Sequence, residues 1–407
     1  MEHVKYLILG AGPAGLTFAR RLLDKGENSF LVLEKEDCAG GLCRSVNVDG
    51  APFDIGGGHF LDVRRPKVNE FLFRFMPEEE WILFERDSRI WVNGLTINHP
   101  FESNIWQMDM DSQVDYLISI AKAGCNNEEP MPEKFVDWIK WKLGDKVAQD
   151  YMIPYNQKMF ADELNLLGTY WLEKLPNVSF EETLRSCLAH KPYGTQPGHA
   201  SFYYPKKYGY GEVWLRMADS MAEHMVYNQT VSELDFDKKI VSTKSGQKWE
   251  ADVIVTTIPW TCFDILNGMP EDMRNSIYEQ LKHSAIETRY VPEQLDTPAQ
   301  WIYVPDANTP YHRILVRHNF CQNSKGYWLE TRQERTGSYD GDENYHYLNE
   351  YAYPLNTIGK PELVHKILSF AKERNVYGLG RWGEHSHYNS DLVVELAMNM
   401  AEELVGE

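Results

Sequence analysis

The sequence of 407 residues has no long apolar run near its start and no pair of cysteines at a metal-binding or redox spacing. The apolar run Tyr6–Leu9 is too short for a signal-peptide core or a membrane span. The six cysteines are scattered, without a CxxC pair or a histidine at metal spacing, which argues against a zinc site and indicates reduced thiols. We therefore expect a cytoplasmic protein that does not insert into a membrane and holds no metal.

Positive charge is also scarce, with 41 Lys and Arg against 60 Asp and Glu and a formal net charge of −19. A field of this sign repels nucleic acids and anionic membranes, so neither is an expected partner. An anionic small molecule needs a local pocket of arginines and backbone N–H groups. The sequence has no Ser/Gly linker, repeat or low-complexity tract, and its length predicts two or three domains.

The first 34 residues predict a strand, a helix and a second strand. Tyr6–Leu9 is a buried-strand run, apolar residues then recur at helical spacing up to Lys25-Gly26, and Phe30–Leu33 forms the next strand. This order is that of a βαβ unit, so the fold class is α/β with a parallel sheet.

A dinucleotide fingerprint lies between that strand and helix. Gly10, Gly12 and Gly15 have the GxGxxG spacing, and Glu34 ends the second strand. The first glycine permits the turn, the second lets the backbone approach a pyrophosphate, and the third lets helix and strand pack closely. Glu34 would accept hydrogen bonds from a ribose. The fingerprint alone does not choose between FAD and NAD.

Two further glycine-rich stretches and the Gly-Arg motif near the C-terminus favour FAD over NAD, because they resemble motifs of known flavoproteins. Gly40-Gly41-Leu42-Cys43-Arg44-Ser45, Phe53-Asp54-Ile55-Gly56-Gly57-Gly58-His59 and Gly380-Arg381-Trp382-Gly383 resemble motifs of the amine oxidase, protoporphyrinogen oxidase and UDP-galactopyranose mutase group of flavoproteins. The resemblance implies that FAD binds to Gly10, Gly12, Pro13, Ala14, Gly15, Glu34, Lys35, Gly41, Leu42, Gly58, His59, Val231, Gly380, Arg381 and Asn389.

The segment Thr309-Pro310-Tyr311-His312-Arg313-Ile314-Leu315 resembles bacterial UDP-galactopyranose mutases. That resemblance implies His59 and Arg313 as catalytic residues, and Tyr155, Arg313, Tyr353 and His385 as substrate-binding residues. Arg313 would hold a diphosphate with its planar fork. The implied reaction is a pyranose/furanose isomerisation of a nucleoside-diphosphate sugar, without net redox change, through a flavin N5–sugar adduct.

The sequence departs from the mutases in the substrate half of the site. Phe160 stands in place of a tryptophan, Ala352 and His385 in place of tyrosines, and Val178 in place of an arginine. Flavin binding is therefore better supported than UDP-galactose as the ligand.

Each singled-out residue also has a structural interpretation. Arg313 could be a salt-bridged cation, His59 could cap its glycine loop, and Tyr155 and Tyr353 could be core aromatics. His385 and His387 could form a metal pair, but no carboxylate or cysteine joins them at a suitable spacing.

Two other functions stay open. An amine oxidase or protoporphyrinogen oxidase type of oxidoreductase requires an aromatic, mostly uncharged pocket and asks nothing of Arg313. A flavin-binding protein that has lost catalysis and serves as an assembly partner is the third. The oligomeric state is also open, and a homo-oligomer is compatible with the sequence.

The expected domain organisation follows from these motifs and from the local patterns. Residues 1–62, 211–264 and 363–407 form a discontinuous FAD-binding domain, residues 103–190 a helical insertion, and residues 63–102, 191–210 and 265–362 an antiparallel-sheet substrate domain. Strands are expected at 301–304 and 313–316, and an amphipathic helix from Asp391.

Overall fold

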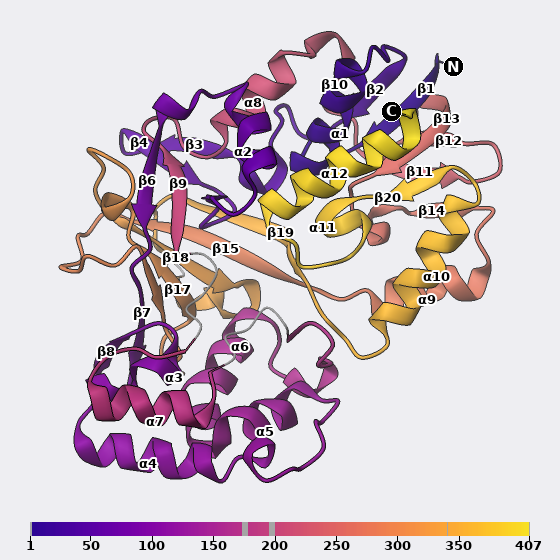
Figure 1. The fold of residues 1–407 in the computed structure, drawn as a ribbon. Coiled ribbons are helices and arrows are strands. Elements are labelled where there is room, and N and C mark those ends of the chain that lie inside the picture. Colours follow the sequence, from indigo (N-terminus) through magenta and orange to yellow (C-terminus); the bar gives the residue numbers. More distant parts are fainter. Residues whose placement is uncertain (1, 173–177, 195–199, 340, 407) are drawn as a thin grey trace.

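A computed structural model of the chain has two large sheets that meet at an angle and a separate group of helices (Figure 1). The structure describes residues 2–172, 178–194, 200–339 and 341–406. Among these residues, no helix is both long and apolar enough to cross a membrane.

The first sheet is built around β1 (Glu2–Leu9), whose last residues are apolar on both faces. Tyr6 and Ile8 pack into a core with α1 (Pro13–Asp24) and α12 (Ser390–Val405). Leu7 and Leu9 pack into a second core that includes α10 (Lys360–Lys372). The continuous apolar run is therefore that of a strand covered on both faces, as in parallel sheets.

The strands of this sheet come from three separate stretches of the chain. The sheet order is β10 (Met225–Val226), β2 (Phe30–Leu33), β1, β13 (Lys248–Thr256), β12 (Ile240–Thr243), β11 (Val231–Asp235) and β14 (Ile265–Asn267), with β20 (Val376–Gly378) also paired to β13. β1 is parallel to both β2 and β13, which confirms the predicted βαβ unit. The domain boundaries themselves stay a prediction, and β14 lies just beyond the expected boundary at residue 264.

The second sheet is mostly antiparallel. Its order is β19 (His346–Pro354), β15 (His283–Val291), β18 (Tyr327–Arg332), β17 (Tyr311–Leu315), β16 (Trp301–Tyr303), β7 (Ser88–Val92) and β8 (Leu95–Asn98). In this order β16 and β7 pair in parallel, and the other five neighbouring pairs are antiparallel. The strands expected at 301–304 and 313–316 are confirmed as β16 and β17.

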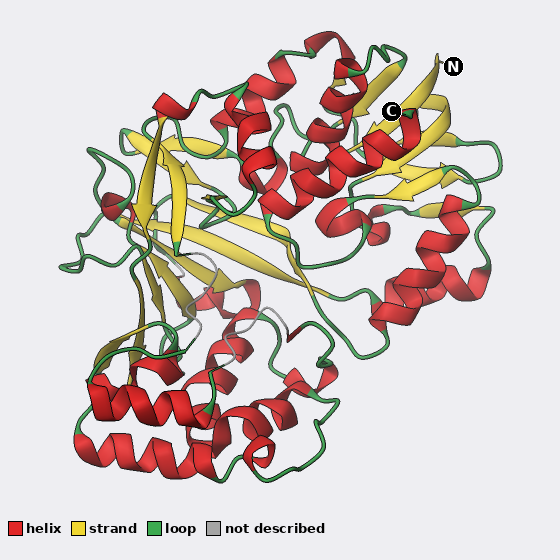
Figure 2. Cartoon of the chain, in the orientation of Figure 1, coloured by secondary structure: helices red, strands yellow, loops and turns green. Residues whose placement is uncertain are grey.

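The predicted helical insertion is confirmed as the lower group of helices in Figure 2. It consists of α3 (Phe101–Asn104), α4 (Met110–Ala121), α5 (Phe135–Val147), a π-helical turn at Ala148–Met152, α6 (Ile153–Met159) and α7 (Phe180–Ala189). Its core also takes in Ile90, Val92 and Ile97 from β7 and β8, which joins the helices to the second sheet.

Smaller elements connect these parts. They are the hairpin β3 (Ser45–Val48) and β4 (Ala51–Asp54), the sheet β5 (Leu61–Asp62), β9 (Ser201–Pro205) and β6 (Trp81–Glu85), and the helices α2 (Pro66–Phe73), α8 (Glu212–Asp219), α9 (Glu271–Gln280) and α11 (Gly380–Gly383).

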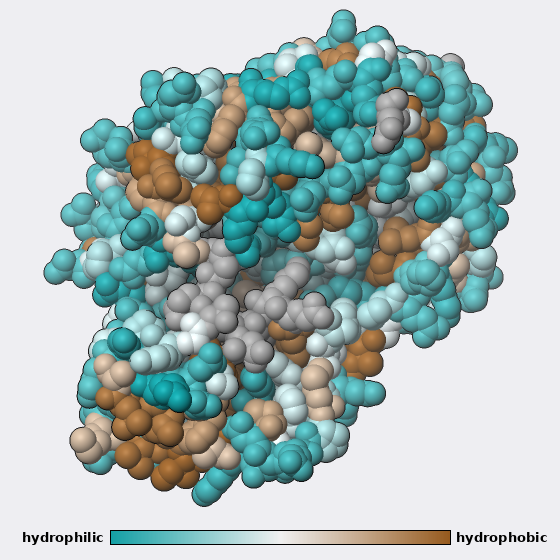
Figure 3. Space-filling model, in the orientation of Figure 1, coloured by the Kyte–Doolittle hydropathy of each residue, from teal (hydrophilic) through white to brown (hydrophobic). Residues whose placement is uncertain are grey.

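One face of the helical group is apolar and exposed. Met110, Val114 and Ile118, spaced four apart on α4, and Leu188 on α7 are all exposed. Figure 3 shows hydrophobic atoms gathered at this end of the molecule. Such a patch is typical of an interaction surface. The homo-oligomer with which the sequence is compatible stays a prediction.

Candidate flavin and substrate site

The turn between β1 and α1 has the close packing that the glycine spacing predicts. A Cβ on Gly15 would lie 2.0 Å from the Gly10 carbonyl oxygen, so only glycine lets α1 approach this closely. α1 begins at Pro13 with Gly12 as its N-cap, and no side chain caps it. The open N–H groups of its first turn suit a phosphate. Gly10, Gly12, Pro13 and Ala14 line a cavity of about 590 Å³.

Glu34 directly follows β2 and lies in the same cavity, as does Lys35. Its Oε2 accepts a hydrogen bond from the Ala11 N–H at 2.7 Å, and its Oε1 accepts one from the Glu36 N–H at 3.0 Å. Burial raises the pKa of this carboxyl, and the two N–H donors oppose the shift. Each oxygen has a further lone pair that a ribose hydroxyl can use.

Two other glycine segments close the cavity. The backbones of Gly12 and Gly41 face each other, since a Cβ on Gly41 would lie 3.1 Å from the Gly12 Cα. Gly380 packs against α1, where its Cβ would lie 2.8 Å from the Ala14 Cβ, and is outside the cavity lining. Gly41, Leu42, Val231 and Arg381 also line the cavity.

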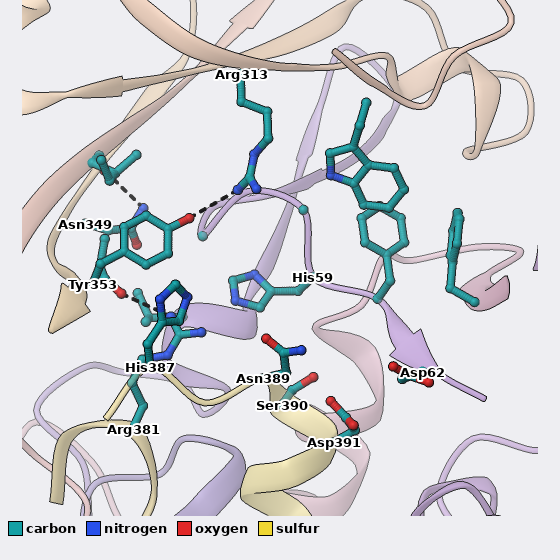
Figure 4. Close-up of a pocket in the computed structure, with 18 of the residues that line it drawn as sticks. His59, Asp62, Arg313, Asn349, Tyr353, Arg381, His387, Asn389, Ser390 and Asp391 are labelled. Atoms are coloured by element: carbon teal, nitrogen blue, oxygen red, sulfur yellow. Dashed lines mark hydrogen bonds between the residues drawn. The ribbon is translucent and has the colours of Figure 1, made fainter. Parts of the chain in front are cut away.

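A second cavity, of about 280 Å³, adjoins the first because His59 and Arg381 line both. Figure 4 shows His59 pointing into it, with Tyr353, His387 and Arg381 to one side and Asp62 to the other. Gly58 and Asn389, both expected at the cofactor, line this cavity as well.

His59 does not cap the glycine loop through its ring. Its Nδ1 is buried and has no hydrogen-bond partner among the residues that the structure describes. Burial, together with the nearby charge of Arg381, lowers the pKa of His59 to about 4. The ring is therefore neutral at pH 7 and has a nitrogen available to a ligand.

These features together fit a dinucleotide with a ring system at one end. Glu34 would hold the adenosine ribose, the N-terminus of α1 and the Gly12–Gly41 cradle would hold the pyrophosphate, and the unpaired Nδ1 of His59 would meet the ring end. A Cβ at Gly12 or Gly41 would enter this cradle.

Arg313 lines the second cavity, but its charge is compensated. Its Nε donates to the Glu330 Oε2 at 2.8 Å and its Nη2 donates to the Tyr353 hydroxyl at 3.1 Å. The Arg313 side chain is 17% exposed and that of Glu330 only 1%. Arg313 is thus both paired with a carboxylate and exposed to the cavity, so its position is compatible with the structural and the functional interpretation.

Arg381 and Arg86 differ from Arg313 in their partners. Arg381 donates only to carbonyl oxygens, from Nε and Nη2 to Tyr388 at 3.1 and 2.8 Å, and from Nη1 to Ala352 at 3.0 Å. Burial lowers the pKa of Arg381. Neither arginine has a carboxylate within ion-pair distance among the residues that the structure describes.

Arg86 was not found by sequence reasoning. Its Nε donates to the Ser88 hydroxyl at 2.7 Å, its Nη2 donates to the Tyr303 hydroxyl at 2.8 Å, and its guanidinium lies 4.5 Å from the centroid of the Trp301 ring. It lines the second cavity. Arg86 lies in the short connection between β6 and β7, and an arginine there carries no local signal that separates it from a surface cation.

The proposed substrate residues divide into two groups. Tyr353 lines the second cavity, and its ring lies 4.9 Å from that of His387, which lines it too. Tyr155 is buried outside the lining, with its ring 5.5 Å from Tyr303 and 5.9 Å from His312.

His385 is also outside the lining of both cavities. Its Nε2 lies 3.0 Å from the Lys282 carbonyl oxygen, and burial lowers the pKa of His385 to about 3. The structure therefore brings His387, two residues later, to the place expected for His385. No group of three metal-ligating side chains occurs in the described part of the chain.

Two of the substituted positions, Ala352 and Phe160, lie at or beside the second cavity. Ala352 lines it, and Phe160 is buried with its ring 6.2 Å from that of Tyr353. Val178 is buried as well. A further charged residue that sequence reasoning missed is Glu330, whose only signal is an acid directly after the apolar run Tyr327-Trp328-Leu329.

Solved structures similar to this one share its fold over nearly the whole chain. A reduced UDP-galactopyranose mutase covers 99% of this chain and 94% of its own, with a TM-score of 0.88 and 23% identity. A putative protoporphyrinogen oxidase from Exiguobacterium has a TM-score of 0.68 with 13% identity over 99% and 98% of the two chains. A putrescine oxidase bound to putrescine has a TM-score of 0.64 with 14% identity over 100% and 99%.

Two curated relatives match short stretches of the chain. A Baeyer-Villiger monooxygenase from Pseudomonas aeruginosa is 32% identical over 90 residues, 22% of this chain and 15% of its own. An uncharacterized protein in the nifH2 3′ region of Methanothermococcus thermolithotrophicus is 49% identical over 53 residues, 13% of this chain and 50% of its own. The chain therefore spans at most half the length of these two relatives.

A family model matches most of the chain. The model, described as flavin containing amine oxidoreductase, matches residues 13–288. This stretch includes the helix after the fingerprint, Glu34, the loop with His59 and the helical insertion. The chain belongs to the flavin containing amine oxidoreductase family, has the fold seen in UDP-galactopyranose mutase, and binds FAD.

Proposed function

We propose that the protein is a mutase that isomerises a nucleoside-diphosphate sugar between pyranose and furanose forms. The fold it shares with a reduced UDP-galactopyranose mutase supports this proposal. The observation that carries it is electrostatic. Arg86 and Arg381 line the second cavity and have no carboxylate partner among the described residues.

Uncompensated positive charge in a cavity favours an anionic ligand. An isolated guanidinium out of bulk water is costly unless it gains a partner, and phosphate suits its planar fork. A protonated amine in the same cavity is repelled by both arginines. The chain as a whole carries a net charge of −19, so the arginines at this cavity do not simply reflect a basic composition.

FAD, when bound and reduced, supplies the nucleophile of such a reaction. The chain itself contributes binding and orientation. Arg86, Arg313 and Arg381 would bind the diphosphate of the substrate, and the Tyr353 hydroxyl, which already accepts from Arg313, would orient toward the sugar. His59, neutral at pH 7, can donate or accept one hydrogen bond at the reacting end.

The test is to reduce the holoprotein anaerobically, add UDP-galactose or another UDP-sugar, and trap with cyanoborohydride. Mass spectrometry of the released flavin should find a sugar-modified flavin. Arg86→Gln should reduce its yield at least tenfold. Arg89→Gln is the matched control, because Arg89 lies on β7 and is paired with Asp87 at 2.9 Å. No modified flavin with any nucleotide sugar would reject the mutase.

An oxidoreductase is the second candidate, favoured by the aromatic part of the same cavity. Phe60 lies 4.2 Å from Trp301 and 4.5 Å from Phe202, measured between ring centroids, and all three line the cavity. Such a wall suits an apolar amine or a reduced ring system. Anaerobic bleaching of the oxidised flavin by an amine, with no nucleotide binding, would select this candidate.

The setting of the reaction is part of the proposal. We place the protein in the cytoplasm, where its six cysteines, all unpaired in the structure, stay reduced. A furanose-forming mutase there would supply sugar nucleotides for polysaccharide biosynthesis. Cell fractionation with immunodetection tests the location.

A further inference from the structure

Glu330 touches two parts of the site at once. Its Oε2 accepts from the Arg313 Nε at 2.8 Å, and its Oε1 accepts from the backbone N–H of Gly58 at 3.2 Å. Gly58 directly precedes His59, and the carboxylate is 1% exposed. One buried carboxylate therefore holds both the cation of the cavity and the loop that carries the cavity histidine.

The loop rests on this carboxylate without spare room. A Cβ on Gly57 would lie 2.0 Å from the Glu330 Oε1. The His59 N–H donates to the Gly57 carbonyl at 2.8 Å, so the three residues form one tight turn against Glu330. Removing or moving the carboxylate must therefore change where this turn, and the ring of His59, lies.

The charge state of the cluster is settled by its neighbours. Burial alone would raise the pKa of Glu330, but the charge of Arg313 and the contacts with Arg313 and His312 together outweigh it and lower that pKa to about 2. His312, fully buried with its Nε2 3.4 Å from the Glu330 Oε2, has its pKa lowered by burial and is neutral. The Arg313–Glu330 pair thus has no net charge.

We propose that Glu330 is a positioning residue that sets the anion affinity of the cavity through Arg313 and fixes His59 through Gly58. An anion that binds Arg313 must compete with Glu330 for the guanidinium. When an anion takes the guanidinium from Glu330, the carboxylate that holds the His59 loop loses its ion-pair partner. Ligand binding and the position of His59 are coupled in this way. The identity of the anion as a nucleoside diphosphate rests on the proposed function, whereas the coupling does not.

Glu330→Gln tests the electrostatic part, because it removes the charge and nearly keeps the shape. It should bind UDP and inorganic pyrophosphate at least threefold more tightly than the wild type, measured from the flavin difference spectrum of the holoprotein. In an Arg313→Met background the same substitution should leave both affinities within twofold. The comparison isolates the part of the effect that passes through Arg313.

Glu330→Ala tests the positional part. It should change the visible circular dichroism of the bound flavin, because the turn at Gly57 to His59 loses its support. Glu287→Gln is the matched control for both variants. Glu287 is paired with Arg289 at 2.8 Å, is also buried, and lies on β15, the strand next to β18. It should alter neither anion affinity nor the flavin spectrum.

The outcomes separate this inference from the proposed function. If the wild type binds pyrophosphate but no nucleotide or nucleotide sugar, the proposed mutase function is rejected. The role of Glu330 is then tested by the pyrophosphate affinities of the variants. If the anion affinity of Glu330→Gln and the flavin spectrum of Glu330→Ala both match the wild type, the inference is wrong. Should Glu330→Ala not fold, Glu330→Asp serves in its place for the positional test, since the shorter side chain cannot reach both partners.

Discussion

Replacing Gly15 by alanine is expected to weaken FAD binding by displacing α1, although Gly15 is outside the lining of the cavity. The new Cβ would lie 2.0 Å from the Gly10 carbonyl oxygen and 3.1 Å from the Ile8 Cγ2. Real Cβ contacts stay beyond 3.0 Å, so α1 must move by about 1 Å. Overpacking of this kind costs about 1–3 kcal/mol.

That displacement draws the first-turn N–H groups of α1 away from the pyrophosphate. A loss of about 1.4–2.8 kcal/mol in binding free energy corresponds to a roughly 10- to 100-fold weaker FAD affinity. The assay is titration of the apoprotein with FAD by flavin fluorescence, with urea unfolding of the apoprotein in parallel.

The matched control is Gly359→Ala. Gly359 has an ordinary φ of −78°, and its Cβ would meet only the Gln280 Oε1, at 3.5 Å. It should bind FAD as the wild type does. If Gly15→Ala and Gly359→Ala have equal FAD affinities and equal unfolding midpoints, the account of the turn is refuted.

Three further substitutions test other parts of the structure. Glu34→Gln places an amide N–H₂ against one of the two N–H donors that Glu34 now holds, and should weaken FAD binding about tenfold in the same titration; unchanged affinity would contradict the ribose assignment. Burial raises the pKa of Asp54 to about 7, above the unfolded value of about 3.9, so the folded state keeps a proton that the unfolded state releases. This contribution to stability is complete below about pH 4 and is lost as the pH rises to 7, so Asp54→Asn should flatten the fall in unfolding free energy between pH 5 and 7; an equal slope in both proteins would show that Asp54 does not titrate there. Lys158 donates hydrogen bonds from its buried Nζ to two carbonyls and a hydroxyl, and Lys158→Met should lower the unfolding free energy by about 2–4 kcal/mol, whereas Lys140→Met, on an exposed side chain, should change it by less than about 0.5 kcal/mol.

The features predicted well from the sequence are those with local causes. β2 spans Phe30–Leu33, as the apolar run bounded by polar residues indicated, and α1 ends at Asp24, just before the expected stop at Lys25-Gly26. The glycine turn is also predictable from local sequence. Gly10 directly follows a strand and Gly15 lies in the first turn of the following helix, so their contact does not depend on distant segments.

The features that sequence reasoning missed depend on pairing between distant segments. Glu330 meets Arg313 because β17 and β18 are antiparallel with these two residues opposite each other, a register that neither strand reveals by itself. His385 has a left-handed backbone, with φ of 45°, just after α11, and it is His387, two residues later, that lines the cavity. A non-glycine residue in that region is uncommon, so local pattern does not predict it.

The flavin domain is completed by the far end of the chain. β20 pairs with β13 in the first sheet, Arg381 and Ser390 line the cavities, and α12 packs against α1. A nascent chain therefore exposes the fingerprint long before it can enclose a cofactor. Capture of FAD must follow release of residues 376–405 from the ribosome, and until then β1 and α1 lack part of their covering surface.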